Sequence, residues 1–268
     1  MVDFSDADLS GSRFERVDLS RSQFQRVRLT DAVIRSADIE RTTFRDVGMR
    51  QVVMRGGEFE DLDIYGELGR VVVNGVDVVA YVEAELDRRY PDRPAMRAED
   101  PAGFRHAWDV VERLWSDTVA QARRLDPDLL HESVDGEWSF IQTLRHLSFA
   151  TDAWVRRAIL GDPAPWHRLD LPWEEAPPMD GITRDRDVRP SLDEVVELRR
   201  DRMASVRSVI DSLTDESLAA DTEPVDAPGW PRPRSYPVKD CLRIVLNEEW
   251  EHRLYAERDL AVLESRGR

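Results

Sequence analysis

The first sixty-five residues place a large apolar side chain at every fifth position without a break. The thirteen residues in this series are Phe4, Leu9, Phe14, Leu19, Phe24, Leu29, Ile34, Ile39, Phe44, Met49, Met54, Phe59 and Ile64. Two positions before almost every one of them stands a smaller residue, most often Val, Ala, Ser or Thr. Helices repeat every 3.6 residues and strands every two, so the pattern predicts another architecture with two inward positions per five residues. The period stops at Gly69, where the next large residue is due.

This series resembles the pentapeptide-repeat family. The resemblance implies a right-handed, four-sided β-helix over residues 1–69, with four repeats to a coil and about three coils in all. We expect a docking or stabilising module that binds a protein partner or self-associates. Some relatives are acidic DNA mimics. Residues 1–65 hold thirteen acids and ten arginines, so most of the net charge of −16 lies elsewhere, and DNA mimicry is the weaker interpretation.

Residues 70–99 are expected to link this module to a second domain. Val71-Val72-Val73 followed by Asn74-Gly75 predicts a short strand and a tight turn. The apolar spacing from Val78 to Arg89 predicts a short helix, which Pro91 and Pro94 end.

From residue 100 to residue 268 the apolar spacing becomes helical. Asp100-Pro101 is typical of a helix start, and Ser139 with Gln142 and Ser191 with Glu194 are two capping boxes. The second helix is expected to run to about residue 160, and a fourth begins after Pro237. Four amphipathic helices of this length predict an all-α four-helix bundle, so the fold class is a β-helix followed by a bundle.

Two connections in the bundle are unusually long, residues 162–190 and 214–236. Both contain prolines and tryptophans, including Trp166, Trp173 and Trp230. Loops of this length are usually lids, binding loops or disordered. The tryptophans favour a packed segment, either over a mouth of the bundle or in a purely structural role.

Composition narrows the class of protein. The chain is 41% hydrophobic, which suffices for a core, and its single cysteine excludes a disulfide framework. The N-terminus has no basic or apolar leader, and no run of eighteen apolar residues occurs. We therefore expect a soluble cytoplasmic protein. The excess of acid argues against nucleic-acid and anionic-membrane binding.

Polar side chains interrupt the apolar stripe of the fourth helix. Glu248 and His252 stand one turn apart where apolar residues are due, and a buried carboxylate needs compensation. On the second helix, His146 stands over a face of small residues. Brought together, the three form a set of two histidines and one carboxylate suited to Zn²⁺, Ni²⁺ or Fe²⁺. A buried ionic network without metal is the alternative.

Two motifs around these residues resemble the DinB superfamily, a four-helix bundle with a metal site. They are Gly136-Glu137-Trp138-Ser139 leading to Leu144-Arg145-His146-Leu147, and Asn247-Glu248-Glu249-Trp250-Glu251-His252-Arg253. His146 and His252 match the family's ligand histidines, while Glu248 stands where the family usually has histidine. Glu249 is the rival ligand or a supporting residue, three positions before His252 as in carboxylate-bridged bundles.

The resemblance implies an activity. DinB-like proteins include transferases and isomerases that use thiols such as mycothiol or bacillithiol, and a divalent ion would bind such a thiol as the thiolate. We therefore expect a thiol S-transferase acting on a small-molecule substrate. One alternative is a non-catalytic scaffold acting through the repeat. The other is a hydrolase with Glu249 as general base.

The remaining candidates are assigned more local roles. His167 is a possible fourth ligand or proton donor, and Trp166 and Tyr255 are expected on the substrate side of the site. Trp138 is interpreted as a structural anchor and Cys241 as an apolar filler. His106 is expected to face solvent, and neither it nor His131 has a partner in the sequence.

Overall fold

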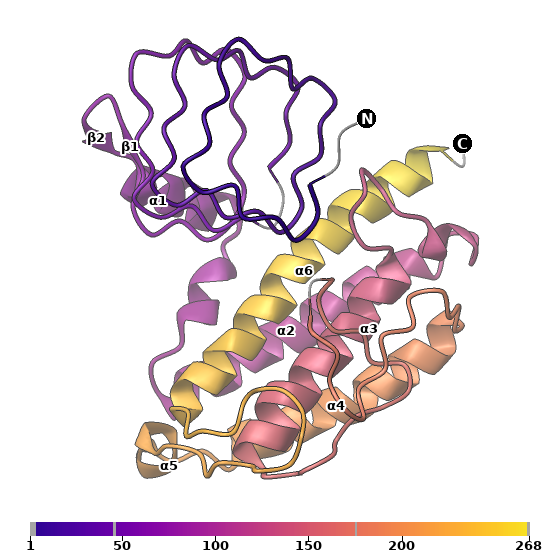
Figure 1. Ribbon diagram of the computed structural model, residues 1–268. Coiled ribbons are helices and arrows are strands. Elements are labelled where there is room, and N and C mark those ends of the chain that lie inside the picture. The colour runs from indigo at the N-terminus through magenta and orange to yellow at the C-terminus, as the bar shows by residue number, and fades with distance from the viewer. Residues whose placement is uncertain (1–3, 45–46, 175, 267–268) are drawn as a thin grey trace. The chain divides into compact units, whose positions relative to one another are not determined.

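The structure is a computed structural model that describes residues 4–44, 47–174 and 176–266. The chain folds as two compact units, Met1–Tyr65 and Gly66–Arg268. Figure 1 shows the first as a series of stacked turns of extended chain and the second as a group of long helices. Each unit is described by itself.

The repeat unit turns at the same point in most of its described repeats. Backbone φ is positive two residues after ten of the large apolar residues from Phe4 to Met54, at positions Asp6, Gly11, Arg16, Arg21, Arg26, Asp31, Ser36, Arg41, Gln51 and Gly56. Side chains reinforce two of these repeats, because Asp8 and Asp18 each accept the backbone N–H of the serine two residues later at 2.9 Å. The five-residue period of the sequence is therefore also a five-residue period of the backbone.

The side chains of the repeat differ from the sequence-based prediction. The thirteen large residues were expected to point inward, but all are exposed, from 41% for Leu9 to 66% for Ile34. No residue of the described ranges 4–44 and 47–65 belongs to a strand. The backbone hydrogen bonds in these ranges are local, such as Ser12 N–H to Leu9 O at 3.1 Å. Without a ladder between successive turns, the apolar side chains stay open to solvent.

The segment after the repeat forms the predicted hairpin and short helix. Strands β1 (Val72–Val73) and β2 (Val76–Asp77) pair antiparallel. Asn74 and Gly75 between them both have positive φ, as a two-residue hairpin turn requires. Helix α1 (Val79–Arg89) follows, and then the 3₁₀ helix η1 (Arg93–Arg97), which packs against the bundle through the buried side chain of Met96.

Four long helices form the bundle. They are α2 (Pro101–Ala122), α3 (Phe140–Thr151) continued by η3 (Asp152–Ile159), α4 (Leu192–Asp211) and α6 (Val238–Arg266). Contacts run around a ring, from α2 to α6, from α6 to α3, from α3 to α4 and from α4 to α2 (Figure 1). The predicted Asp100 cap and both capping boxes are confirmed. Buried side chains such as Trp108, Leu144 and Leu246 fill the centre.

The second helix changes its winding at Asp152, which the sequence pattern did not indicate. From there to Ile159 the chain is a π-helix, a form that is rare and often lies at functional sites. Two shorter helices complete the unit, η2 (Leu129–His131) and α5 (Asp215–Ala219). No described helix is long and apolar enough to cross a membrane.

Both long loops are packed onto the bundle. Trp166, Trp173 and Trp230 gather with Phe149 and Ile182 in one apolar cluster. The guanidinium of Arg157 ties the loops together, because it donates to Pro163 O at 2.9 Å and to Val225 O at 3.1 Å. The prediction of packed loops is therefore confirmed.

Candidate metal centre

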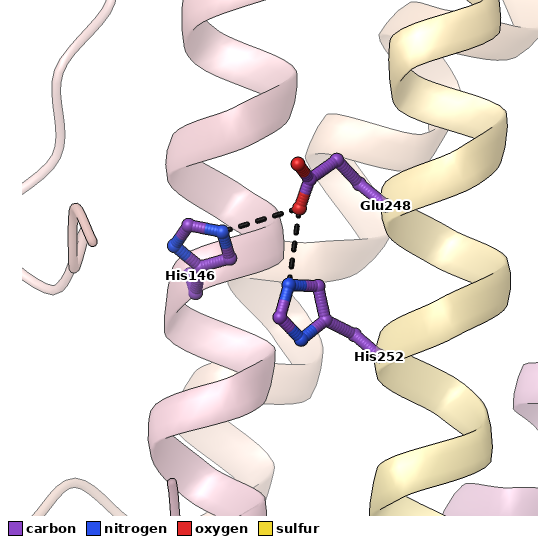
Figure 2. A group of neighbouring side chains, drawn as sticks. All are labelled: His146, Glu248 and His252. Carbon is purple, nitrogen blue, oxygen red and sulfur yellow. Dashed lines mark hydrogen bonds and ion pairs between the residues drawn. The ribbon is translucent and has the colours of Figure 1, made fainter. Parts of the chain in front are cut away.

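The bundle brings His146, Glu248 and His252 to one point. His146 comes from α3, while Glu248 and His252 come from successive turns of α6 and point the same way (Figure 2). His146 Nε2 lies 3.2 Å from Glu248 Oε2, and His252 Nε2 lies 3.1 Å from the same oxygen. One ligand atom of each residue lies within 4.8 Å of the others, so the group could hold a metal ion.

The hydrogen bond on the far side of His146 decides what its near nitrogen can do. His146 Nδ1 lies 3.0 Å from the carbonyl oxygen of Leu171, which can only accept, so Nδ1 carries the proton. In the neutral ring Nε2 then offers a lone pair, and it faces a carboxylate oxygen that also only accepts. Two acceptors this close need a cation or a proton between them. A metal ion would be such a cation, and the residues present fit one.

The electrostatics of the group favour neutral histidine beside charged carboxylate. Burial is the largest influence on His146 and lowers its pKa, despite the raising effect of Glu248. Burial would raise the pKa of Glu248, but its contacts with His146 and His252 outweigh burial and hold that pKa well below the usual range. Metal binding requires neutral imidazole and ionised carboxylate, which are the states that these shifts favour for His146 and Glu248.

An indole ring covers the two imidazoles. Trp138 stacks on His252 with 5.6 Å between ring centroids and 8° between planes, and its centroid is 4.4 Å from that of His146. The sequence interpretation of Trp138 as a helix-start anchor missed this contact. Trp138 directly precedes the cap residue Ser139, and no periodic pattern relates it to His252 on another helix. Phe149 adds a further aromatic ring 6.2 Å from His146.

The residues predicted for the substrate side lie at different distances from the group of His146, Glu248 and His252. Tyr255 is close, with its ring 6.5 Å from that of His252. Trp166 stacks at 5.8 Å on Phe149 and therefore lies one ring further out. His167 is not among the grouped ligands, and its Nδ1 accepts the N–H of Leu169 at 3.2 Å. The structure thus ties His167 to its own loop and does not support it as a fourth ligand.

Glu249 is turned away from the group. Its carboxylate is 1% exposed and accepts two hydrogen bonds from Nη2 of Arg199 on α4, at 2.8 and 2.7 Å. The structure therefore does not support Glu249 as the rival ligand, because successive helix positions point about 100° apart and Arg199 binds this carboxylate. Glu249 remains near enough to influence its neighbours, since both His252 and Glu248 affect its pKa.

The other polar candidates have no part in the group. His106 is exposed, as predicted, and His131 is partly buried on η2. Cys241 is fully buried, and burial raises the pKa of its thiol to about 12, so it is a packing residue rather than a nucleophile.

Comparison with known families agrees with this geometry. A sequence model of the DinB superfamily matches residues 111–256, more than half of the chain. The chain belongs to the DinB superfamily. A model for pentapeptide repeats matches residues 2–35 and 12–51, so both resemblances are confirmed. Neither the curated proteins nor the solved structures give a match. The DinB range contains all three grouped residues, His146, Glu248 and His252.

Proposed function

We propose that this protein is a divalent-metal-dependent thiol S-transferase of the DinB superfamily, with His146, Glu248 and His252 as metal ligands. One observation carries the ligand assignment: the lone pair of His146 Nε2 faces the carboxylate of Glu248 at 3.2 Å. When bound, a divalent ion would lower the pKa of a thiol cosubstrate and make its thiolate available at neutral pH. The metal would be Zn²⁺, Ni²⁺ or Fe²⁺, which two nitrogens and one oxygen suit.

The chain's own residues account for the remaining requirements. The Leu171 carbonyl orients His146, and Trp138 covers both imidazoles. Glu248 is about a third exposed, so the group is not sealed from solvent. The only cysteine, Cys241, is buried, so the sulfur must come from a cosubstrate. In the transfer a thiol loses its proton, a carbon–sulfur bond forms on the electrophile, and the leaving group departs with its bonding electrons.

The test begins with metal content. Elemental mass spectrometry of the purified full chain should find one ion per molecule in the wild type and in His106→Ala, and a much lower content in folded His252→Ala. Thiols such as mycothiol are then screened with electrophiles. Equal metal in the wild type and His252→Ala would overturn the ligand assignment. Metal bound without any thiol transfer would overturn the activity alone.

The structure weakens the hydrolase alternative. Its general base was to be Glu249, and that carboxylate is held by Arg199 in the core. We do not propose it.

A second proposed role belongs to the repeat. We propose that residues 1–69 form a pentapeptide-repeat module that docks onto a protein partner or a second copy, with residues 70–99 as the connection and 100–268 as the DinB bundle. The observation that favours it is the row of exposed apolar side chains from Phe4 to Ile64. Sedimentation of the full chain should show association that the substitution of Phe14 and Phe24 by arginine removes. If the wild type already sediments as a monomer and the arginine variant has the same mass, self-association is excluded and only a separate protein remains as the partner.

A further inference from the structure

Two acids meet in the core beside the candidate metal centre. Asp152 is the first residue of η3, and Asp170 lies in the loop that follows; both are 0% exposed. Asp152 Oδ2 accepts from Nε and Nη2 of Arg202, at 3.2 and 2.8 Å. Asp170 Oδ2 accepts the backbone N–H of His167 at 2.7 Å. The Oδ1 atoms of both acids are buried and receive no N–H donor from the described residues.

The two carboxyl groups lie within hydrogen-bonding reach of each other. Burial raises the pKa of both, and that of Asp170 rises further because Asp152 is beside it. Two buried carboxylates in contact cannot both stay charged at low cost. Arg202 balances one of them, and a proton on the other would be donated across the pair. Such a shared proton would account for the two Oδ1 atoms that have no other donor.

Asp170 lies between Leu169 and Leu171, whose carbonyl oxygens both accept hydrogen bonds from side chains of α3. Arg145, buried on α3, donates from Nε to Leu169 O at 2.7 Å. His146 donates from Nδ1 to Leu171 O at 3.0 Å, and the Leu171 N–H returns a bond to Arg145 O at 3.4 Å. The Leu171 carbonyl therefore belongs to a short loop segment that includes Asp170 and that α3 binds on both sides of it.

We propose that Asp170 is a positioning residue for His146. The Asp152–Asp170 carboxyl pair anchors the segment 169–171 to η3 and, through Arg202, to α4. This anchor keeps the Leu171 carbonyl against Nδ1 of His146, so that Nε2 is the nitrogen free to bind a metal. The predicted effect on metal affinity rests on the proposed function. The effect on the tautomer of His146 does not, because it can be measured in the metal-free protein.

The experiment uses the full chain with ¹⁵N-labelled histidine, of which there are five. Two-bond ¹⁵N–¹H spectra of the metal-free protein report which ring nitrogen carries the proton, and His146→Gln identifies the His146 signal. Zn²⁺ affinity is measured by competition with a chromophoric chelator. The variants are Asp170→Ala, which removes the pair, and Asp170→Asn, whose amide can still accept from His167 and donate to Asp152. The matched control is Asp180→Ala, an exposed aspartate of the same loop.

The wild type and Asp180→Ala should show His146 protonated on Nδ1. Asp170→Ala should mix the two tautomers and weaken Zn²⁺ binding by about 10- to 100-fold, the effect usual for a residue that orients a metal ligand. Asp170→Asn should restore both readouts. Wild-type affinity and tautomer in folded Asp170→Ala would overturn the proposal.

Two further outcomes are equally decisive. If Asp170→Ala does not fold, the wild type still decides, because a His146 protonated on Nε2 would contradict the proposal. So would a folded Asp170→Asn that binds Zn²⁺ far more weakly than the wild type. If the wild type binds no Zn²⁺, the proposed function fails, while the tautomers of the wild type and Asp170→Asn still test the anchor.

Discussion

His146 Nε2 lies 3.2 Å from Glu248 Oε2, although the other ring nitrogen of His146 already donates its proton to Leu171 O. Helices far apart in the sequence thus direct two acceptors at each other. Such an arrangement is unfavourable by itself and becomes favourable around a cation. This one contact is the observation on which the proposed metal site rests.

Replacing Glu248 by glutamine should make the contact with His146 favourable without a cation and unsuitable for a metal ion. The amide of Glu248→Gln can donate to His146 Nε2, so the metal-free protein should gain about 1 kcal/mol in its free energy of unfolding. Metal content should fall strongly, because the site loses its only anionic ligand. Urea unfolding and elemental analysis measure the two effects, with Glu251→Gln on the same helix as control. Retained metal together with unchanged stability would contradict the assignment.

The Arg199–Glu249 pair should be structural and not part of the metal site. Arg199→Met leaves the buried carboxylate of Glu249 without its partner and should lower the free energy of unfolding by about 3–5 kcal/mol. Adding Glu249→Leu should recover most of that loss. Glu249→Gln alone should keep the metal content of the wild type. Loss of metal in a stable, folded Glu249→Gln would restore Glu249 as a ligand.

Trp138 should report metal binding through its fluorescence. Its indole lies 5.6 Å from His252, so a paramagnetic ion such as Cu²⁺ or Ni²⁺ at the site should quench it. Trp138→Phe should lose that part of the quenching yet still bind metal, whereas Trp154→Phe should behave as the wild type, because Trp154 packs on Tyr236 instead. Trp138→Ala should also lose about 0.5–1.5 kcal/mol of stability with the aromatic contacts. Identical quenching in all variants would place the ion elsewhere.

The Asp152–Asp170 pair should make stability depend on pH. Burial raises the pKa of Asp170 well above the ordinary value of 3.8, so the folded protein keeps a proton that the unfolded chain releases. This contribution is complete below pH 3.8 and is lost as pH rises through the raised pKa, by up to about 1.4 kcal/mol per pH unit. The charged groups that face the pair are Arg202, Arg156 and Asp201, which are linked by ion pairs.

The measurement compares urea unfolding of the wild type and Asp170→Asn between pH 4 and 8. The wild type should lose stability relative to the variant as pH rises, and Asp180→Asn should follow the wild type. Parallel curves for the wild type and Asp170→Asn would show that the pair holds no shared proton. Because both proteins contain the same histidines, the difference between their stabilities cancels the pH dependence that the histidines contribute.

Much of the bundle could be predicted from local patterns. Asp100, Ser139 and Ser191 mark helix starts because each side chain bonds the backbone of its own first turn, and the structure confirms all three. Glu248 and His252 could be paired because one helical turn brings them together. The choice of Glu248 over Glu249 rested on the family motif, and only the position of Arg199 gives it a physical reason.

In the repeat, the sequence pattern predicted the backbone period but not the burial of the side chains. Its five-residue period appears in the backbone angles from Asp6 to Gly56, as a local property of the chain should. Burial of Phe14 or Ile34 depends instead on contacts between successive turns, and there the structure differs from the prediction.

The sequence by itself determined the two kinds of periodicity, the helix starts and the three polar residues on core faces, because these follow from neighbours a few positions apart. The tertiary structure decided what each polar group meets. It set the Leu171 carbonyl against His146, Trp138 over both imidazoles, Arg199 on Glu249 and Asp170 beside Asp152. Apart from the contact of Trp138 with His146, these contacts join residues from 18 to more than 100 positions apart, so no local pattern contains them, and packing fixes which pairs form.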